Sequence, residues 1–471
     1  MSDNAPPLQL FEKKERIFPK RVWGKFRKIK WLVMVITLGI YYLAPFLRWD
    51  RGPHAPDQAI LIDMPARRAY FFFIEIWPQE VYYLTGILIL AAVALFFATS
   101  LFGRVWCGYA CPQTVWTDLF VWVERIVQGD RAKRMRLANA PWSFEKLWKM
   151  ALTQSLWLVI GLLTGGAWVF YFNDAPTLLE HILNFDVPWS VGGWIIALTF
   201  STYVMAGFAR EQVCMYMCPY SRFQSAMFDR DTLIIGYDEK RGEPRGKHKK
   251  GESWDGRGDC VDCTACVQVC PMGIDIRDGL QMECIACGLC VDACDDIMDK
   301  VGRPRGLIRY DTTNNQLARE EGIKERSHLL RARTVYYTAI LALVGGIMLY
   351  GLTHRDPVEL HVLHDRNPLF VTMSDGRIRN GYDVKILNKT HTDKKYSLSV
   401  DGLSGADIRV QGAGNLEASH LPVFADSVGH FRVFVTADKP TAIRSEIVVR
   451  VEEVEGETAA QYDGIFMSGR P

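Results

Sequence analysis

Five runs of this 471-residue chain are apolar over lengths that suit a helix crossing a lipid bilayer. Such a helix needs about 20 residues. The run at 81–102 has no charged residue, which favours a membrane span over the buried helix of a soluble protein. We therefore predict a membrane protein with five transmembrane helices. The predicted spans are 31–47, 81–102, 150–172, 191–209 and 335–352.

Lysine and arginine residues are unevenly distributed between the segments that connect these spans. Nine precede the first span: Lys13, Lys14, Arg16, Lys20, Arg21, Lys25, Arg27, Lys28 and Lys30. A second basic group follows the second span: Arg125, Arg131, Lys133, Arg134 and Arg136. The 173–190 segment has none. By the positive-inside rule the N-terminus lies inside and the C-terminus outside, although Arg48, Arg51, Arg67 and Arg68 weaken this signal. About 30 residues precede the first span, so we expect it to remain as an anchor rather than be cleaved.

Eight of the 12 cysteines form two runs with matched spacing between the fourth and fifth spans. Each run reads Cys-x2-Cys-x2-Cys-x3-Cys, the bacterial ferredoxin pattern for two [4Fe–4S] clusters. In that pattern the fourth cysteine of each run binds the other cluster. The first cluster is therefore assigned to Cys260, Cys263, Cys266 and Cys294. The second is assigned to Cys284, Cys287, Cys290 and Cys270.

Zinc is the alternative occupant, because Cys-x2-Cys pairs also bind zinc. Two matched runs of four cysteines disfavour it. The one departure from the ferredoxin pattern is Asp295, where proline would follow the last cysteine. This changes a local turn and leaves the number of ligands unchanged. Gly273 and Gly288 suit the crowded backbone near the sulfurs.

The remaining four cysteines form a repeated Cys-x3-Cys-Pro motif that follows the second and the fourth span. The pairs are Cys107 with Cys111 and Cys214 with Cys218. Both spans run from outside to inside, so both pairs are expected at the inner edge of the membrane, beside the clusters. Residues four apart on a helix share a face, so the two sulfurs of a pair can converge. The following proline tends to end or kink the helix.

Soft thiolates select Cu(I) or iron–sulfur chemistry over hard cations. The pairs could bind copper, receive electrons as a dithiol, or jointly hold another metal centre, with Met215 and Met217 as additional thioether ligands. Buried structural cysteines are the alternative, which the duplication of the motif disfavours. Our hypothesis is that the two pairs face each other and form one soft-metal site.

The last 118 residues alternate in hydrophobicity and contain no cysteine. Short alternating segments at 358–364, 382–387, 396–400, 431–436 and 447–451 are separated by turn residues. This rhythm predicts an immunoglobulin-like β-sandwich whose core depends on apolar packing. His354, His361 and His364 could suggest copper binding outside, but three such residues are more often ordinary surface residues.

The composition excludes several other functions. The formal net charge is only +2, and the basic stretch at 241–250, with Lys247, His248, Lys249 and Lys250, lacks interleaved aromatic residues. We therefore do not expect nucleic-acid binding. We do expect the basic stretch to contact anionic lipid. The sequence has no glycine-rich phosphate loop, dinucleotide fingerprint or c-type haem motif. Electrons must then come from a separate donor, a soluble carrier or a quinol.

Together these features resemble the cytochrome c oxidase accessory proteins called CcoG, FixG or RdxA. The stretches WCGYACPQT, CMYMCPYSRFQ and RNPLFVTMSDGRIRNGYDVKILNKT carry the resemblance. It implies a bacterial inner-membrane protein whose N-terminus and ferredoxin domain are cytoplasmic and whose C-terminal domain is periplasmic. It also implies Cu(II) reduction to Cu(I) for assembly of a cbb-type oxidase, with oxidase subunits and copper-handling assembly factors as partners.

The expected domains follow from the spans and motifs. They are a cytoplasmic segment (1–30), spans one to four with the thiol motifs (31–210, the second motif continuing to 219), a two-cluster ferredoxin-like domain (220–333), the fifth span (334–353) and an immunoglobulin-like domain (354–471).

We expect an iron–sulfur electron-transfer protein that acts as a cupric reductase, with copper as substrate or transient ligand of the four membrane-edge cysteines. Two alternatives remain open. One is a quinol-linked polyferredoxin relay, as in nitrate and nitrous-oxide pathways, without a copper role. The other is a non-enzymatic oxidase assembly factor or redox sensor with structural clusters.

Overall fold

The structure is a computed structural model that describes residues 16–53, 55–249, 251–325, 330–412, 414–440 and 442–469. Three cations of the sequence analysis, Lys13, Lys14 and Lys250, lie outside the described residues. The chain divides into two compact units. The first comprises Met1–Leu47 and Gln58–Met348, and the second comprises Arg48–Asp57 and Leu349–Pro471.

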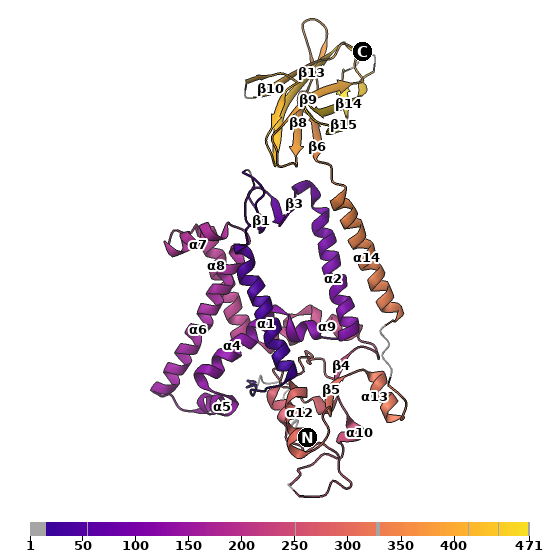
Figure 1. Cartoon of the computed structure of the whole chain (residues 1–471). Coiled ribbons are helices and arrows are strands. Elements are labelled where there is room, and N and C mark those ends of the chain that lie inside the picture. Colours follow the sequence, from indigo (N-terminus) through magenta and orange to yellow (C-terminus); the bar gives the residue numbers. More distant parts are fainter. Residues whose placement is uncertain are drawn as a thin grey trace, which may run out of the picture. The chain divides into compact units, whose positions relative to one another are not determined.

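Five helices of the described residues are long and apolar enough to cross a membrane, which confirms the predicted membrane architecture (Figure 1). They are α1 (Lys25–Leu43), α2 (Tyr82–Phe102), α6 (Phe144–Val169), α8 (Trp189–Val204) and α14 (Ala332–Thr353). The short helices η1 (Ala44–Phe46) and η2 (Pro78–Glu80) adjoin α1 and α2, and the π-helical turn η3 (Met205–Ala209) continues α8. Both α1 and α6 begin six residues before the predicted spans, because hydropathy marks the apolar stretch rather than the helix end.

Two spans approach each other closely through small residues. A Cβ atom on Gly165 would lie 2.8 Å from the Ile195 carbonyl oxygen of α8, and one on Gly161 would lie 3.1 Å from the Thr199 carbonyl oxygen. Small residues allow such close packing of membrane helices, where van der Waals contact drives association. The α6 and α8 backbones are therefore closely packed along this stretch.

Several elements between the spans were not predicted. After α2 come α3 (Val105–Tyr109), α4 (Pro112–Gln128) and α5 (Arg131–Asn139), where the sequence predicted the first thiol motif and a basic group but not three helices. Helix α7 (Ala175–Leu183) lies between α6 and α8. Three short strands, β1 (Ile60–Asp63), β2 (Arg68–Phe71) and β3 (Ile74–Ile76), form an antiparallel sheet between α1 and α2 in the chain. Their shortness explains why alternation did not reveal them.

The segment between α8 and α14 holds the two cysteine runs. After the π-helical turn η4 (Val213–Met217) and α9 (Pro219–Met227), strands β4 (Ile234–Tyr237) and β5 (Ile308–Asp311) pair antiparallel. Between them lie α10 (Glu239–Gly242), α11 (Ala265–Val269), η5 (Ile276–Asp278) and α12 (Leu289–Val301), and α13 (Thr313–Glu320) follows β5. We call the region from β4 to α13 the insert.

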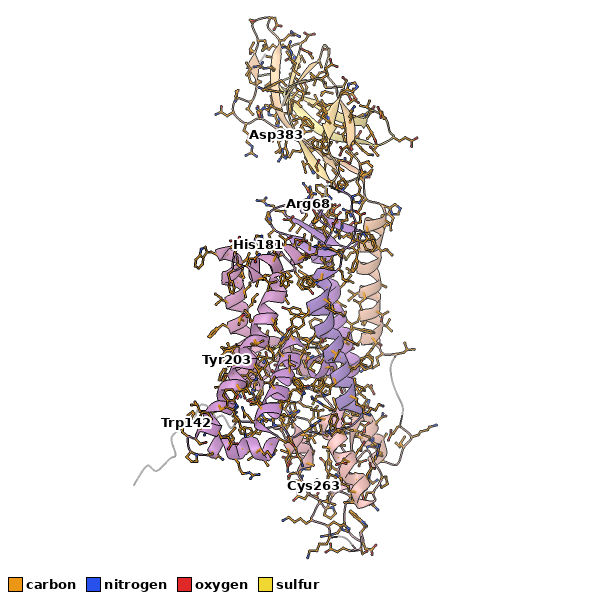
Figure 2. All side chains as sticks on the ribbon, turned by 60° about the vertical axis from the view of Figure 1, so that its left-hand side comes forward. Arg68, Trp142, His181, Tyr203, Cys263 and Asp383 are labelled. Atoms are coloured by element: carbon orange, nitrogen blue, oxygen red, sulfur yellow. The ribbon has the colours of Figure 1, made fainter. Side chains whose placement is uncertain are left out.

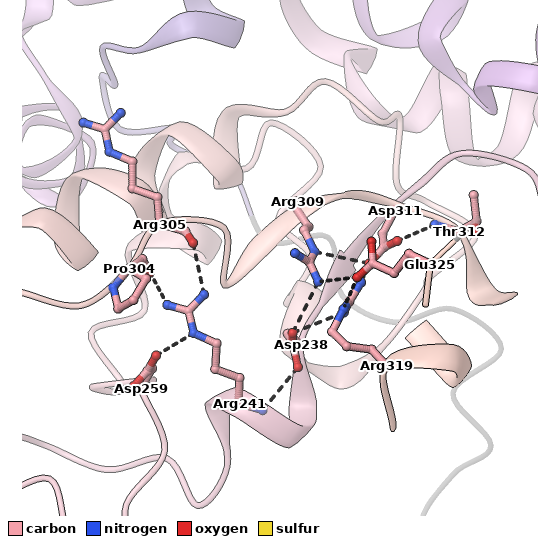
Figure 3. A network of polar contacts seen from close by, with 10 residues as sticks. All are labelled: Asp238, Arg241, Asp259, Pro304, Arg305, Arg309, Asp311, Thr312, Arg319 and Glu325. Carbon is pink, nitrogen blue, oxygen red and sulfur yellow. Dashed lines mark hydrogen bonds and ion pairs between the residues drawn. The ribbon is translucent and has the colours of Figure 1, made fainter. Parts of the chain in front are cut away.

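A polar network holds the edges of the insert together (Figure 3). Arg319 of α13 pairs with Asp238, which precedes α10, and with Asp311 of β5. Arg241 of α10 pairs with Asp259 and donates to the carbonyl oxygens of Pro304 and Arg305. Because Asp259 directly precedes Cys260, this network fixes the start of the first cysteine run.

The second unit is a β-sandwich, as predicted. One sheet has the order β11-β10-β13-β8-β6 with β7 paired to β8, and the other has the order β12-β9-β14-β15. Buried apolar side chains of both sheets form one core. Tyr382 donates a hydrogen bond to the Ile465 carbonyl oxygen (2.9 Å) and so joins the sheets. The strands are β6 (Val358–His364), β7 (Val371–Thr372), β8 (Ile378–Asn388), β9 (Lys394–Asp401), β10 (Asp407–Gly412), β11 (Gly414–Leu416), β12 (Leu421–Val423), β13 (Ser427–Ala437), β14 (Arg444–Glu453) and β15 (Ala459–Met467).

The three histidines considered for copper do not converge in this unit. His364 contacts Asn380 (2.6 Å), and His361 lies near Glu359 (3.7 Å). Among the described residues, no group of three or more histidine, cysteine or acidic side chains is arranged to hold a metal ion.

Candidate iron–sulfur and thiol centre

The first cysteine run and the last cysteine of the second run line one small cavity in the insert. Cys260 and Cys263 lie on the loop before α11, Cys266 lies on α11, and Cys294 lies on α12. Figure 2 labels Cys263. Apolar side chains complete the wall, and Arg277 contributes the charge. This is the residue set that the spacing assigns to the first cluster.

A second cavity is lined by Cys284, Cys287 and Cys290 together with Cys270 of the first run. Cys266 also reaches this wall, so the two cavities are neighbours. Isoleucine and methionine side chains form the rest of the wall. The fourth cysteine of each run therefore lies with the first three of the other, in the crossed arrangement of two-cluster ferredoxins.

The chemistry of both cavities fits iron–sulfur clusters. Burial raises the pKa of Cys270 and of Cys294 to about 12, so deprotonation here needs a bound cationic centre. The cysteines line cavities and do not converge on the position of one ion among the described residues. Zinc would require such convergence, whereas a cluster brings its own four iron atoms.

Both membrane-edge thiol pairs lie at junctions between helices. Cys107 is in α3 and Cys111 is the residue before α4, whereas Cys214 is in η4 and Cys218 precedes α9. Pro112 and Pro219 are each the first residue of the next helix, where the missing N–H costs nothing. The expectation that both sulfurs of a pair lie on one face of the same helix is therefore wrong, because the second cysteine of each pair directly precedes a proline that starts a new helix.

The first pair contacts the loop that binds the second cluster. A Cβ on Gly108 would lie 2.7 Å from the Ile285 carbonyl oxygen and 3.0 Å from the Cys287 Cα atom. The Tyr109 hydroxyl donates to the Cys287 carbonyl oxygen (3.1 Å). Backbone contact of this kind leaves no room for solvent between the motif and the cluster loop.

Arg104 ties the two thiol motifs to this loop. Its guanidinium donates to the carbonyl oxygens of Met282 and of Ser221, the latter in the helix that follows Cys218. The Cys107 thiol donates to Gln224 Oε1 (3.3 Å) in the same helix. The sequence assigned no role to Arg104 or Gln224, although Gln224 ends one of the quoted motif stretches and Arg104 lies just before another, because their contacts depend on how the helices pack.

The four thiols share one environment. Cys107 and Cys214 pack against the same buried cluster of side chains, which includes Cys287 and Leu289. Burial, together with the neighbouring thiols, raises the pKa of Cys107 to about 12 and that of Cys214 to about 11. Cys111 and Cys218 contribute to each of these shifts, so all four sulfurs lie within electrostatic range.

The repeated motif is not symmetric in the structure. Tyr109 is buried (6% exposed) against the cluster loop, whereas its counterpart Tyr216 is 68% exposed. Met215 packs against the shared core, but Met217 is 58% exposed. Of the two methionines considered as extra ligands, only Met215 is therefore beside the thiols.

The insert is also anchored to the first span. The Asp292 carboxylate of α12 accepts hydrogen bonds from the backbone N–H groups of Phe26 (3.1 Å) and Arg27 (2.7 Å) at the start of α1. This is a helix cap supplied by a residue 265 positions away, and it also satisfies the positive end of the α1 dipole.

Comparison with known protein families agrees with this arrangement. Residues 209–313 match the 4Fe-4S dicluster domain, and residues 84–129, which contain Cys107 and Cys111, match a 4Fe-4S binding domain. Residues 348–469 match the immunoglobulin-like fold found at the C-terminus of FixG.

Curated relatives match nearly the full length. The nitrogen fixation protein FixG of Rhizobium meliloti is 51% identical over 460 residues, covering 91% of this chain and 88% of that protein. The protein RdxB of Cereibacter sphaeroides is 51% identical over 473 residues, covering 99% of this chain and 98% of that protein. The chain belongs to the FixG/RdxA/RdxB family. This family assignment confirms the resemblance and the iron–sulfur electron-transfer character of the chain.

A more distant relative lacks much of the FixG-type chain. The ferredoxin-type protein NapH of Haemophilus influenzae is 24% identical over 229 residues, covering 44% of this chain and 65% of that protein. The similarity to NapH therefore covers less than half of this chain.

Proposed function

We propose that this chain is a cupric reductase: an inner-membrane iron–sulfur protein that reduces Cu(II) to Cu(I) for maturation of a cbb-type cytochrome c oxidase. The observation that carries the proposal is the contact between the first thiol motif and the loop of the second cluster. Gly108 and Tyr109 adjoin the backbone of Ile285 and Cys287. A copper ion on these thiols would be close enough to receive electrons from that cluster.

Four cysteines of the chain would bind the copper ion: Cys107, Cys111, Cys214 and Cys218. Among the described residues no three of them already surround one ion position, so their side chains would have to close on the ion as it binds. Thiolates stabilise Cu(I) more than Cu(II), which favours the reduced product. Burial raises the pKa of Cys107 and Cys214, so metal binding there must displace protons. Clusters bound by the eight ferredoxin cysteines would supply single electrons, and each Cu(II) takes one.

The proposal includes a location and partners. The N-terminus and the insert are assigned to the cytoplasm and the second unit to the periplasm, on the distribution of Lys and Arg. Oxidase subunits and copper-handling assembly factors are the proposed partners, together with the lipid bilayer and a separate electron donor. The second unit, which has a folded core of its own, suits contact with such a partner.

The test is anaerobic purification with iron, sulfide and copper counts, followed by addition of Cu(II) to the chemically reduced protein. We expect about eight iron atoms for two clusters, loss of the reduced-cluster signal, and one Cu(I) per electron, detected with a Cu(I)-specific chelator. C107S/C214S should lose this reaction and keep the iron. Tyr216→Phe, in the same motif but exposed, is the control. If Cu(II) does not reoxidise the reduced clusters, the proposal is wrong.

A second candidate is an electron relay without copper chemistry, which the NapH match favours. The same reduced protein separates the two functions. A relay would pass electrons to a quinone analogue but not to Cu(II), and the C107S/C214S substitution would change neither result. A purely structural role of the clusters would leave both acceptors without electrons.

A further inference from the structure

A cavity of about 400 Å³ lies beside the membrane helices of the first unit, apart from the cysteines. Its walls come from α4, α5, the first half of α6, η3 and the segment at 16–18. Neither the cluster sites nor the proposed copper site uses it.

The position of the cavity suits a ligand that dissolves in the bilayer. Its α6 lining runs from Lys146 to Trp157, over the first turns of a predicted membrane span. Trp142 precedes this helix and is 74% exposed; Figure 2 labels it, together with Tyr203 on α8. Tryptophan and lysine mark the interface between hydrocarbon and water, so the cavity opens near that level.

The walls combine aromatic surface with a few fixed polar groups. Phe18, Trp142, Met150, Trp157 and Phe208 supply the apolar part. A flat ring with polar substituents is the shape that such a cavity accommodates, since apolar walls bind the ring and sparse polar groups set its orientation.

Hydrogen bonds fix which polar atoms remain for a ligand. Tyr203 donates to Gln154 Oε1 (2.7 Å), so the Gln154 amide NH2 is the remaining donor. Gln128 uses its Nε2 on Thr153 (2.9 Å), which leaves its Oε1 as an acceptor. The Nε atom of Arg134 is buried without a hydrogen-bond partner in the described part of the chain. The cavity thus offers donors and an acceptor to one ligand.

The cations of the wall are already paired, which disfavours an anionic lipid headgroup. Arg16, Arg134 and Arg210 all bind the buried carboxylate of Glu124. Lys146 donates to the carbonyl oxygens of Ala138 (2.9 Å) and Ala140 (2.6 Å). A neutral ring with hydroxyl or carbonyl groups needs no unpaired cation.

A smaller cavity lies between this cavity and the thiols. Arg210 and Glu211 line it and also line a smaller cavity that contains Cys214, Met272 and Ile285. Ile285 and Met272 belong in turn to the wall of the second cluster site. The smaller cavity therefore connects the two sites: Arg210 and Glu211 separate it from the large cavity, and Met272 and Ile285 separate it from the second cluster site.

We propose that this cavity binds a lipid-soluble quinol, which is the electron donor of the chain. The inference rests on the proposed function, in which two Cu(II) ions are the acceptors. The quinol loses two O–H protons and two electrons and becomes a quinone, while two Cu(II) become two Cu(I). Gln154 and Gln128 position the ring oxygens, and both protons leave to the aqueous side.

Binding of decylubiquinone to the purified full chain tests the site by isothermal titration calorimetry, without turnover. We expect saturable one-to-one binding. Gln154→Leu should weaken it about tenfold, the effect of one lost hydrogen bond with a partner left unpaired. Trp142→Phe should weaken it as well. Trp148→Phe, in α6 but outside the cavity lining and 59% exposed, is the matched control for the tryptophan substitution.

A second measurement keeps this inference separate from the proposed function. Decylubiquinol should reduce the clusters of the wild-type chain and of C107S/C214S, with slower reduction in Gln154→Leu, while dithionite reduces all three. Absence of saturable binding, equal affinity of Gln154→Leu and wild type, or displacement of decylubiquinone by phosphatidylglycerol vesicles would each overturn the quinol site. Failure of Cu(II) to reoxidise quinol-reduced protein would instead overturn the copper function and leave the quinol site standing.

Discussion

Gly108 is the residue at which the thiol motif and the cluster loop touch. A methyl group there would meet three backbone atoms within 3.0 Å, and none of these can rotate away. We expect Gly108→Ala to destabilise the first unit by about 1–3 kcal/mol, the usual cost of forced overpacking. It should also slow reoxidation of reduced clusters by Cu(II).

Thermal unfolding and the iron content of the purified protein measure this effect. Gly166→Ala is the control, because nothing lies within 4 Å of the added Cβ in that helix. Equal unfolding midpoints and equal rates for the two variants would show that the contact at Gly108 has no energetic or kinetic importance.

Glu124 is the second residue with a large expected effect. Its side chain is fully buried and bonded to Arg134 and Arg210, while Arg16 approaches from outside. These cations hold the pKa of Glu124 below its usual range, in spite of burial, which opposes ionisation. Its contribution to stability is therefore present at neutral pH and is lost as the pH falls through that lowered pKa.

Glu124→Gln removes the anion and leaves buried guanidinium groups without a counter-charge. We expect a loss of about 3–5 kcal/mol, as for other broken buried ion pairs. Chemical denaturation followed by tryptophan fluorescence measures it. Glu145→Gln, which breaks an exposed pair with Lys149, should change stability by less than about 1 kcal/mol. Similar losses in both variants would mean that the buried network is not stabilising.

At the scale of elements, the sequence predicted best what depends on local pattern. The spacing of the eight ferredoxin cysteines predicted which of them line each cavity. The lengths of the apolar runs predicted the five spans. Alternating hydrophobicity predicted the β-sandwich, for example at 382–387, which lies within β8. The proline after each thiol pair indicated a helix end, but not that a new helix starts there. The sheet of β1, β2 and β3 was not predicted, because strands of three or four residues are too short to show clear alternation.

Features that depend on distant partners could not be predicted in the same way. Arg16 and Arg134 were counted as cations that orient the chain, and the structure places them on Glu124. No sequence pattern indicated the contacts of Arg104 and Asp292, because their partners lie more than 110 residues away. Such contacts follow from how helices pack, which no single stretch of sequence contains.

The cap between α12 and α1 gives a prediction at this scale. Asp292→Ala removes two hydrogen bonds to a charged acceptor, each with a net contribution of about 1.5–3 kcal/mol. We expect faster hydrogen exchange at the Phe26 and Arg27 amides and easier proteolysis of the insert. Asp296→Ala, on the same helix but in an exposed pair with Lys300, is the control. Unchanged exchange at these two amides would show that α1 is capped by other means.

At the scale of the whole molecule, the proposed chemistry stays at one end of the first unit. The cysteines, the cluster cavities and the quinol cavity are linked by shared lining residues such as Arg210 and Ile285. Electrons therefore need not cross the hydrocarbon layer, which is about 30 Å thick. The spans have a structural task in this scheme: they hold the two thiol motifs against the insert and present the cavity to lipid.

This scheme requires the insert and the β-sandwich to lie on opposite sides of the membrane, with the insert in the cytoplasm. Helix α14 has 22 residues, a length of about 33 Å at 1.5 Å per residue, and connects the insert to the β-sandwich. If it spans the bilayer, Ser253 in the insert and Ser374 in the sandwich face opposite aqueous compartments; both residues are exposed. In spheroplasts, a membrane-impermeant maleimide should label Ser374→Cys directly and Ser253→Cys only after permeabilisation, with the unsubstituted chain as background. Labelling of Ser253→Cys in intact spheroplasts would place the clusters outside, where a cytoplasmic copper reaction is impossible.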